Sequence, residues 1–511
     1  MIARDGNCTS LWQATSIPYH PAFTELPAKR FDVVIVGGGI TGISTALLLQ
    51  EAGKSCMVVE AANLCFGTTG GTTAHLNTLL DTPYATIQNK FSKEAALLVL
   101  ESTRHAIQFI QDNINRYQID CNFRNVEACL FAKNEKQEKE LGSILETLNE
   151  IGLPASYFDR LPIPISFRKA IRVKEQAKFN PVRYVYGLAK AFENAGGLII
   201  ENCRVTKVDE KEGLEIHTTK GTVVADDIIY ATHIPPGVNL LHLRCIPYRS
   251  YAMAVSLLND NYPDDLVYDM DDPYHYYRSQ SIDGRQFLIV GGKDHKTAHE
   301  ENTVARFLQL ESHIRSLFEV ESIHSKWSSQ FFESADGLPY IGHLPANPEH
   351  FYVATGFGGH GMIYSAVAAI TLTDMLLNKE CKYADLYDPN RIKPIAGFSN
   401  FVTHNVDVIK QFAGKFFTGD DLPALADLAS GEARIVKYEN HKLAIYKDER
   451  GTIHALNPTC THLKCEVNWN SAEKSWDCPC HGARYSYDGK LLTGPADHDL
   501  EKINIRLLQR H

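Results

Sequence analysis

The sequence lacks the features of a nucleic-acid-binding protein and of a membrane-spanning protein. Acidic residues outnumber basic ones, 61 to 51, and the formal net charge is −10, whereas a nucleic-acid-binding surface shows a basic stripe or patch. No run of eighteen or more apolar residues, the length of a candidate membrane helix, occurs in the chain. The longest candidate, residues 362–377, is interrupted by a serine, two threonines and an aspartate. We therefore expect neither a nucleic-acid partner nor a membrane span.

We also expect no secretion signal. Residues 1–19 mix charged and apolar side chains and contain neither a continuous apolar segment nor a twin-arginine pair, so they do not read as a signal peptide. We find no internal repeat and no low-complexity tract. With 511 residues, 44% of them hydrophobic and 22% charged, the chain is long enough for two or three folded units with large cores. We expect a cytoplasmic protein.

The twelve cysteines are unevenly distributed along the chain. Eight of them are scattered singly between Cys8 and Cys381, as is usual for small buried side chains in a reducing compartment. The other four fall between positions 460 and 480. A cluster of this density needs a specific chemical explanation.

The first strong structural pattern is a strand, a helix and a second strand near the N-terminus. Residues 31–36 form a short run rich in β-branched side chains, as expected for a buried parallel strand. Apolar residues recur at helical spacing over 41–52, and residues 55–60 read as the second strand. This order predicts the βαβ opening of an α/β domain.

The rest of the chain divides into a mixed body and a small all-β module. Helical patterns (93–113, 134–151, 362–377) alternate with strand patterns (197–200, 223–231, 287–290, 351–354) as far as about residue 390. From residue 426 short strands separated by turns follow one another. We therefore predict four parts: a polar lead-in over 1–30, a doubly wound, Rossmann-like α/β domain with an inserted α+β substrate domain over 31–390, a linker that docks on this body over 391–425, and a small all-β domain over 426–511.

The clustered cysteines alternate with histidines in two short motifs. Cys460 and His462 form Cys-x-His, and Cys478 and His481 form Cys-x-x-His. Two loops that each offer a thiolate and an imidazole can place two sulfurs on one iron and two nitrogens on the other, which is the ligand set of a Rieske [2Fe–2S] cluster. A zinc site uses the same residue types but usually places paired cysteines before paired histidines, and a metal-free structural motif is a third interpretation. The interleaved order favours the cluster.

This region resembles the Rieske ferredoxin-like family. Beyond the two motifs, the resemblance rests on Asn457-Pro458, Trp469-Asn470, Trp476-Asp477, Asp488-Gly489 and Gly494-Pro495-Ala496. It implies that the ligands are Cys460, His462, Cys478 and His481, and that Gly494-Pro495 forms a third loop that shields the cluster from water. It also implies a disulfide between Cys465 and Cys480, as in the cytochrome-complex branch of the family.

Two positions near the ligands bear on the reduction potential of such a cluster. The branch with the disulfide often has a serine two residues after the last ligand histidine, where this chain has Ala483. Tyr485 matches the family tyrosine whose hydroxyl bonds a ligand sulfur. Because hydrogen bonds to cluster sulfur stabilise the more negative reduced state, the resemblance implies a lower potential than in high-potential respiratory centres.

Residues 37–42 read Gly-Gly-Gly-Ile-Thr-Gly, a G-x-G-x-x-G motif between a strand and a helix. In such a motif the first glycine (Gly37) permits the tight turn, the second (Gly39) lets the backbone approach a pyrophosphate, and the third (Gly42) lets the helix and strand pack closely. Glu60 ends the second strand, where a carboxylate accepts hydrogen bonds from ribose hydroxyls. The glycines alone would be a weak signal, but in this order they predict a dinucleotide site.

Residues 31–385 resemble the D-amino-acid oxidase-like FAD oxidoreductases, which include glycine and sarcosine oxidases. The resemblance rests on the glycine- and threonine-rich segment 67–74, on Ser-Ala-Asp-Gly-Leu-Pro at 334–339 and on residues 352–362. It implies FAD, held without a covalent bond because no cysteine lies at the linkage position. The FAD contacts that it implies are Thr68, Thr69, Thr72, Thr73, Gly356, Gly361 and Met362. A simple flexible loop is the alternative interpretation of 356–361.

The chain departs from the amine-oxidase members of that family at the substrate end. Gly359 and Ile363 occupy the positions of the arginine and the lysine that hold the substrate carboxylate in glycine and sarcosine oxidases, and Ile289 replaces the lysine that promotes oxygen attack. Arg249 and Arg278 lie beside tyrosines and could anchor an anion instead, or form stacking pairs. We name Arg278 and His360 as candidate catalytic residues, with a structural role as the alternative.

Together these features predict an FAD-dependent dehydrogenase with C–N oxidation as its chemistry, a small-molecule substrate, and electron transfer through a Rieske cluster to a protein or small carrier. A reductase, in which an external donor reduces the cluster and then the flavin, is the alternative enzyme. An electron carrier or redox sensor with a degenerate substrate site is the third hypothesis.

Overall fold

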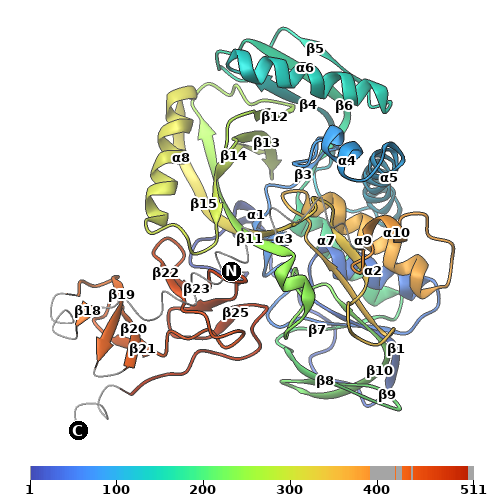
Figure 1. Cartoon of the computed structure of the whole chain (residues 1–511), viewed down its shortest axis with the longest axis vertical. Helices are drawn as coiled ribbons and strands as arrows, with labels where there is room; N and C mark the ends of the chain where they lie inside the picture. Colours follow the sequence, from blue (N-terminus) through green and yellow to red (C-terminus); the bar gives the residue numbers. More distant parts are fainter. Residues whose placement is uncertain (1, 392–419, 422–427, 439–440, 505–511) are drawn as a thin grey trace.

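The computed structural model describes residues 2–391, 420–421, 428–438 and 441–504. Figure 1 shows two large sheets with their helices and a smaller β-rich region beside them, formed by the C-terminal part of the chain. The predicted linker over 391–425, including its proposed docking on the body, lies almost entirely outside the described residues.

The first sheet is the α/β core that the N-terminal pattern predicts. Its strands lie in the order β16-β17-β10-β1-β2-β7, with β9 beside β10 and β8 beside β9. The bounds are β1 (Arg30–Val36), β2 (Cys56–Val59), β7 (Leu198–Ile200), β8 (Val205–Lys211), β9 (Gly213–Thr218), β10 (Gly221–Tyr230), β16 (Tyr340–His343) and β17 (Phe351–Thr355). The central strands β7, β2, β1, β10 and β17 are parallel. This is a doubly wound arrangement, as expected.

Four helices pack around this sheet and around one another: α2 (Ile40–Glu51), α5 (Lys93–Tyr117), α7 (Pro181–Asn194) and α9 (Gly361–Leu376). α9 contacts both α2 and α5, and most of its side chains are buried. Burial on nearly all sides explains why residues 362–377 are so apolar. Within the described residues, no helix combines the length and hydropathy needed to cross a bilayer.

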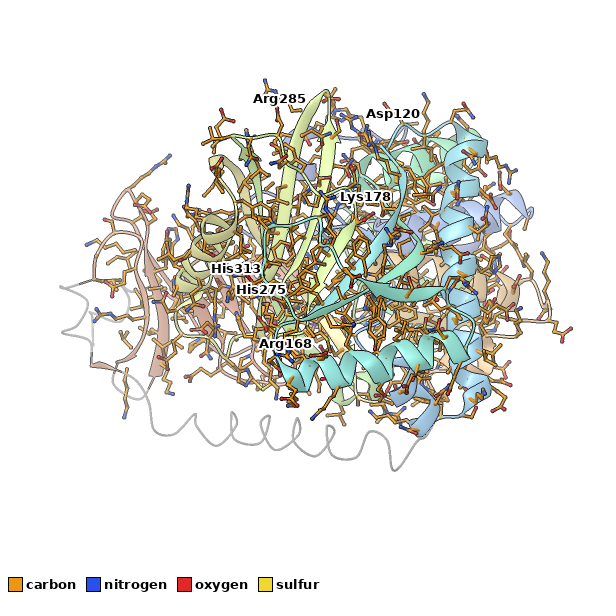
Figure 2. All side chains as sticks on the ribbon, turned by 90° about the horizontal axis from the view of Figure 1, so that it is seen from above. Asp120, Arg168, Lys178, His275, Arg285 and His313 are labelled. Atoms are coloured by element: carbon orange, nitrogen blue, oxygen red, sulfur yellow. A yellow bond between two sulfur atoms is a disulfide. The ribbon has the colours of Figure 1, made fainter. Side chains whose placement is uncertain are left out.

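The second sheet forms the predicted α+β domain. Its strands lie in the order β15-β11-β14-β13-β12-β4-β6-β3, with β5 beside β6. The bounds are β3 (His75–Leu76), β4 (Arg124–Ala132), β5 (Ala155–Phe158), β6 (Lys169–Lys178), β11 (Cys245–Leu257), β12 (Leu266–Asp269), β13 (Tyr276–Ile282), β14 (Arg285–Lys296) and β15 (Val320–Ser334). Helices α6 (Glu135–Glu150) and α8 (Thr303–Leu317) pack on it. His313 of α8 stacks on His275, with ring centroids 3.9 Å apart (Figure 2).

The C-terminal region consists of two four-stranded sheets. The first contains β18 (Asp420–Asp421), β19 (Ala433–Tyr438), β20 (His441–Lys447) and β21 (Ile453–Leu456), and the second contains β22 (Asn468–Asn470), β23 (Ser475–Asp477), β24 (Arg484–Ser486) and β25 (Leu491–Thr493). The remaining short elements are α1 (Leu11–Thr15), α3 (Thr68–Gly71), α4 (Tyr84–Lys90), η1 (Leu240–Leu243) and α10 (Ala384–Tyr387). The all-β character predicted for this region is confirmed.

The N-terminal segment differs from the polar lead-in that we predicted. Trp12 in α1 is fully buried, and its Nε1 donates a hydrogen bond to the carbonyl oxygen of Thr72 (2.6 Å). Arg4 and Asp5 are buried as well. The departure is confined to the first part of the predicted lead-in, where Arg4 and Asp5 pair with other charges inside the protein, since residues 14–30 are all exposed or half-buried.

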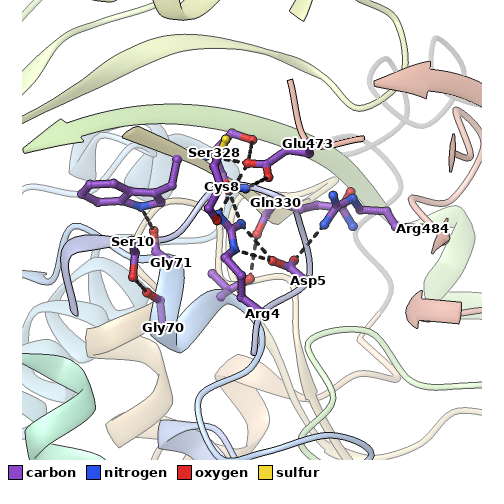
Figure 3. Close-up of polar contacts among 12 residues, drawn as sticks. Arg4, Asp5, Cys8, Ser10, Gly70, Gly71, Ser328, Gln330, Glu473 and Arg484 are labelled. Carbon is purple, nitrogen blue, oxygen red and sulfur yellow. Dashed lines mark hydrogen bonds and ion pairs between the residues drawn. The ribbon is translucent and has the colours of Figure 1, made fainter. Parts of the chain in front are cut away.

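A buried network of six charges joins the N-terminal segment, the second sheet and the C-terminal region; Figure 3 shows four of its members, Arg4, Asp5, Glu473 and Arg484. Its members are Arg4, Asp5, Arg249, Glu473, Asp477 and Arg484, three positive and three negative. Arg484 bonds Asp5 at 2.8 Å and Asp477 at 3.1 Å. Burial opposes ionisation of Asp5, but Arg4 and Arg484 lower its pKa to about 2. Arg4 and Asp5 form a neutral pair, and Arg249 of the second sheet balances the net charge of −1 carried by Glu473, Asp477 and Arg484.

Replacing Arg484 by methionine is expected to destabilise the protein by about 3–5 kcal/mol, because each of two buried carboxylates, Asp5 and Asp477, loses one of its positive partners. Thermal unfolding of the full chain measures the effect. Lys139→Met is the matched control, since Lys139 pairs with Glu135 on the surface, where both side chains are more than 70% exposed, and such pairs contribute about 1 kcal/mol at most. Equal melting temperatures for the two variants would contradict the role given to the network.

Candidate functional site

A large cavity lies where the parallel strands of the first sheet end and the second sheet begins. Ten of the predicted site residues line it, namely Gly37, Gly39, Glu60, Thr68, Thr69, Thr72, Thr73, His360, Gly361 and Met362. The cavity therefore brings together segments that are three hundred residues apart in the sequence. Two predicted cofactor contacts, Gly42 and Gly356, do not line it.

The glycine motif forms the turn between β1 and α2. Gly37 has a φ of +116°, and a Cβ there would lie 2.5 Å from the carbonyl oxygen of Ala231. A Cβ at Gly42 would lie 2.0 Å from the carbonyl oxygen of Gly37. Gly42 thus permits the close packing of α2 on the turn, which is the role predicted for the third glycine. It does not line the cavity.

Glu60 stabilises the same turn. Its carboxylate accepts hydrogen bonds from the backbone N–H of Gly38 (2.7 Å) and of Ala62 (2.8 Å). Burial raises the pKa of the carboxyl group, and these two donors oppose the rise. The carboxylate lines the cavity, so its predicted contact with a ribose stays a prediction that its position allows.

The threonine-rich segment lies against the second sheet. Thr68 Oγ1 donates to the carbonyl oxygen of Gln330 on β15 (2.8 Å), and Thr69 Oγ1 accepts from the N–H of Ile40 at the start of α2 (3.2 Å). These contacts fix the segment beside the glycine turn. Thr72 and Thr73 follow it along the cavity wall.

At the other end of the cavity, α9 begins at Gly361. His360 is its N-cap residue and makes no side-chain capping bond; instead, its Nε2 lies 2.8 Å from the backbone nitrogen of Asp81 and 3.2 Å from the carboxylate of the same residue. A Cβ at Gly361 would meet nothing within 4 Å. Gly356 has a φ of +73° and a Cβ there would approach Ser334 at 3.2 Å, so its role is to make the turn before α9.

The cavity fits a flavin dinucleotide. The N-cap residues of α2 and α9, Gly39 and His360, provide no side-chain cap, so N–H groups at the starts of both helices are available to a ligand. Helix N-termini of this kind bind phosphate and other electron-rich groups. The positions of Thr68 to Thr73 between the two helices are compatible with contacts along the cofactor.

Arg278, one of the two candidate catalytic residues, does not line the cavity, and we withdraw that assignment. The side chain is fully buried, and its Nη1 donates to the carbonyl oxygens of Thr73 (2.9 Å) and Ala74 (2.5 Å). Its Nη2 donates to Gln280. Arg278 therefore supports the threonine-rich segment from behind. Arg249 likewise belongs to the buried charge network and lies outside the cavity lining.

In the C-terminal region the two ligand motifs form facing loops. The imidazole rings of His462 and His481 have centroids 5.0 Å apart, and the Cys460 and Cys478 thiols interact directly, which lowers the pKa of Cys460 to about 7. Cys465 and Cys480 form a disulfide between the loops, with a Cα–Cα distance of 6.5 Å. His462 Nδ1 is buried without a hydrogen-bond partner. Two buried thiols, the buried imidazole of His481 and the half-buried imidazole of His462 form a donor set that fits a Rieske cluster.

The segment 232–242, which sequence reasoning missed, lies between the two sites. His233, Ile234 and Pro236 line the cavity. Gly237 accepts a hydrogen bond from His462 Nε2 (3.1 Å) and donates its N–H to the carbonyl oxygen of Pro495 (3.2 Å). The predicted third loop of the cluster domain also reaches the cavity, at Leu492–Gly494 and Ala496. No local motif marks this segment, because its importance comes from contacts that are distant in sequence.

A dinucleotide cavity that adjoins a thiolate–imidazole loop pair defines a redox protein with two prosthetic groups. The model of the FAD dependent oxidoreductase family matches residues 32–375, and that of the Rieske [2Fe-2S] domain matches residues 421–504. The chain belongs to the FAD dependent oxidoreductase family and carries a C-terminal Rieske domain. FAD and a [2Fe–2S] cluster are the cofactors that these domains indicate.

Known proteins resemble the chain over its whole length or over the flavin part. YhfW of Bacillus subtilis (strain 168), whose name assigns it to Rieske 2Fe-2S iron-sulfur proteins, is 32% identical over 495 residues, with 96% of each chain covered. The gamma-glutamylputrescine oxidoreductase of Escherichia coli (strain K12) is 26% identical, covering 72% of this chain and 88% of that protein. The glycine oxidase of Geobacillus kaustophilus shares the fold with a TM-score of 0.59 and 20% identity, covering 71% of this chain and 99% of that one.

Restoring the missing hydrogen-bond donor near the cluster is expected to raise its reduction potential. Tyr485 Oη lies 3.3 Å from Cys460 Sγ, whereas Ala483 is buried and offers no donor. Since a hydrogen bond to a charged group contributes about 1.5–3 kcal/mol, Ala483→Ser should raise the potential by roughly 60–130 mV, and Tyr485→Phe should lower it by a similar amount. A redox titration followed by visible absorbance measures both. An unchanged potential in Ala483→Ser would contradict this explanation.

Proposed function

We propose that the protein is a dehydrogenase that oxidises the C–N bond of a small amine or amino-acid-like substrate and passes the electrons from FAD to its own Rieske cluster. When bound, FAD supplies an acceptor for a hydride and the cluster a one-electron carrier. A one-electron carrier is of little use to an oxidase that gives both electrons to O₂, which is why we favour a dehydrogenase.

The observation that carries the proposal is the shared wall between the two sites. Residues 233, 234 and 236 face the cavity, and Gly237 bonds the ligand residue His462. The ring of His242, in η1, lies 4.7 Å from that of His462 and 6.0 Å from that of His481, measured between centroids. A continuous packed path of a few residues thus supports electron transfer within one molecule.

The residues of the chain have separate tasks in this proposal. The glycine turn and the threonine-rich segment bind the dinucleotide, and the start of α9 stabilises negative charge that develops on the reduced ring. Arg278 positions the threonine-rich segment through its bonds to Thr73 and Ala74. His360 and Asp81 fix the loop that closes the substrate end. The disulfide and the third loop keep water from the cluster.

Electrons must leave the cluster to a separate acceptor, either a protein or a small carrier, and we place the enzyme in the cytoplasm. Outside the two ligand motifs and the Cys465–Cys480 bridge, eight cysteines form no disulfide, which is typical of a reducing compartment.

Anaerobic addition of alkylamines and amino acids to the protein loaded with both cofactors tests the proposal. We expect one of these substrates to bleach the flavin absorbance and then to reduce the cluster. Bleaching only by reduced ferredoxin or NAD(P)H would instead identify a reductase, in which electrons move from cluster to flavin. No response to any substrate would favour a carrier or sensor.

A further inference from the structure

The substrate end of the cavity is acidic and aromatic. Asp81 of the loop between β3 and α4, Asp294 of β14 and Glu333 of β15 converge there. Among the described residues that line the cavity, lysine is absent and Arg204 is the one arginine. Arg204 lies at the opposite end, close enough to interact with Glu60. Among the described residues that line the cavity, no lysine or arginine therefore lies beside these three acids.

Of the three acids, Asp81 already has partners within the protein. Its carboxylate accepts hydrogen bonds from Tyr274 Oη (3.0 Å) and from the N–H of Gly359 (3.0 Å), and it lies 3.2 Å from His360 Nε2. Burial opposes ionisation, but the interactions with His360 and Tyr274 lower the pKa of Asp81 to about 2. Asp81 is a fixed negative charge that holds the loop.

Asp294 and Glu333 have weaker compensation: a hydrogen bond with Ser250 lowers the pKa of Asp294, and the charge of Lys296 lowers that of Glu333. Burial is the main cause that raises the pKa of each to about 7, and repulsion from Asp81 adds to it. Asp294 Oδ1 is buried without a hydrogen-bond partner. Asn77 is a second buried acceptor without a donor. It lines the cavity, its side chain is only 2% exposed, and its Oδ1 has no hydrogen-bond partner. Buried acceptors without donors are costly unless a ligand supplies the donors.

Aromatic side chains surround these acceptors. Tyr268, Tyr274 and Tyr276 all line the cavity, and the rings of Tyr274 and Tyr276 have centroids 5.7 Å apart. Gly291 makes room for Tyr276, because a Cβ there would lie 2.1 Å from the tyrosine ring. Aromatic faces attract cations, and more strongly when water is excluded.

The described residues that line the substrate end offer no arginine or lysine that could bind a substrate carboxylate. Position 359 is a glycine whose N–H is already bonded to Asp81, and Ile363 is fully buried. The two arginines that sequence analysis offered as anion anchors, Arg249 and Arg278, are occupied outside the cavity. An amino acid would bring its carboxylate into a site that repels it.

We propose that the substrate end binds a cationic amine without a carboxylate near its reacting carbon, with Asp294 and Glu333 as its counter-charges and Asn77 as a further acceptor. This inference rests on the proposed function, because it names the substrate class of the same site. The N–H donors of an alkylammonium satisfy the unpartnered oxygens, and its single positive charge is attracted by both acidic groups.

Three probes of the same shape and different charge test this inference by calorimetry on the full chain loaded with FAD and the cluster. They are tert-butylammonium, the neutral tert-butanol and the anionic pivalate. The carbon that bears the nitrogen in tert-butylammonium has no hydrogen, so this probe binds without being oxidised. We expect the cation to bind about tenfold to hundredfold more tightly than either of the others, as for a hydrogen bond between charged groups.

Asp294→Asn and Glu333→Gln should each weaken binding of the cation about tenfold or more, while the FAD content of the variants stays unchanged. Asp159→Asn, at an exposed position outside the cavity, is the control and should bind the cation normally. Pivalate binding as tightly as the cation, or unchanged cation affinity in both variants, would overturn the inference. If the cation binds as expected but no amine bleaches the flavin, the proposed function fails and the cationic site stands.

Discussion

Cys478→Ser is expected to abolish the iron–sulfur cluster while leaving the flavin in place. A serine oxygen is a poor replacement for one of only two thiolate ligands on an iron, so iron and acid-labile sulfide should fall below about a tenth of their normal content. Cys478 does not line the flavin cavity, so the FAD contacts should remain. Iron, sulfide and FAD analyses of the purified variant measure the result.

The same variant separates the two halves of the reaction. With a substrate amine it should still bleach the flavin under anaerobic conditions, but it should no longer reduce a one-electron acceptor. Cys381→Ser is the control, because Cys381 is a half-buried free cysteine far from the ligand motifs in the sequence. Retention of iron in Cys478→Ser would contradict the ligand assignment, and unimpaired electron delivery would contradict the route through the cluster.

Gly42→Ala is expected to deprive the protein of FAD. The added methyl group would lie 2.0 Å from the carbonyl oxygen of Gly37, so α2 must move away from the turn that approaches the pyrophosphate. Displacement of both the phosphate-binding turn and the helix N-terminus should lower FAD affinity by at least about a hundredfold, the equivalent of two or more good hydrogen bonds. Flavin content and fluorescence titration with FAD measure it.

A matched substitution exists elsewhere in the chain. Gly142 lies within α6, and a Cβ there would meet only the hydroxyl of Tyr157, at 3.5 Å. Gly142→Ala should therefore keep FAD and gain roughly 0.5–1 kcal/mol of stability. Iron content serves as a second readout, since the cluster domain of Gly42→Ala should stay loaded. Normal FAD binding by Gly42→Ala would refute the role assigned to the third glycine.

The parts of the molecule that the sequence predicts well are those that local patterns encode. The strand at 31–36, the glycine turn, the helix at 41–52 and the carboxylate at position 60 follow one another within thirty residues. The four proposed cluster ligands likewise lie in two motifs of three and four residues. Each of these features requires particular residue types at fixed spacing, so a single sequence suffices to predict them.

The parts of the molecule that the sequence does not predict depend on contacts between distant segments. β11 pairs with both β14 and β15, and nothing in its own residues specifies those partners. Arg4 and Asp5 look like surface residues until Arg484 pairs with Asp5. The tyrosines next to Arg278 in the sequence suggest an anion anchor. In the structure its guanidinium instead donates hydrogen bonds to backbone carbonyl oxygens at positions 73 and 74. The acidic substrate end and the role of segment 232–242 also depend on contacts between distant segments, so only the three-dimensional structure reveals them.

Electron transfer from flavin to cluster within one molecule is the central claim, and rapid mixing under anaerobic conditions tests it most directly. The fully loaded protein is mixed with a substrate amine, flavin bleaching is followed by absorbance, and cluster reduction is followed by electron paramagnetic resonance of frozen samples. We predict that the cluster becomes reduced after the flavin, at a rate that does not change when the protein concentration is varied tenfold. A cluster that stays oxidised beside a bleached flavin, or a rate proportional to protein concentration, would contradict the claim.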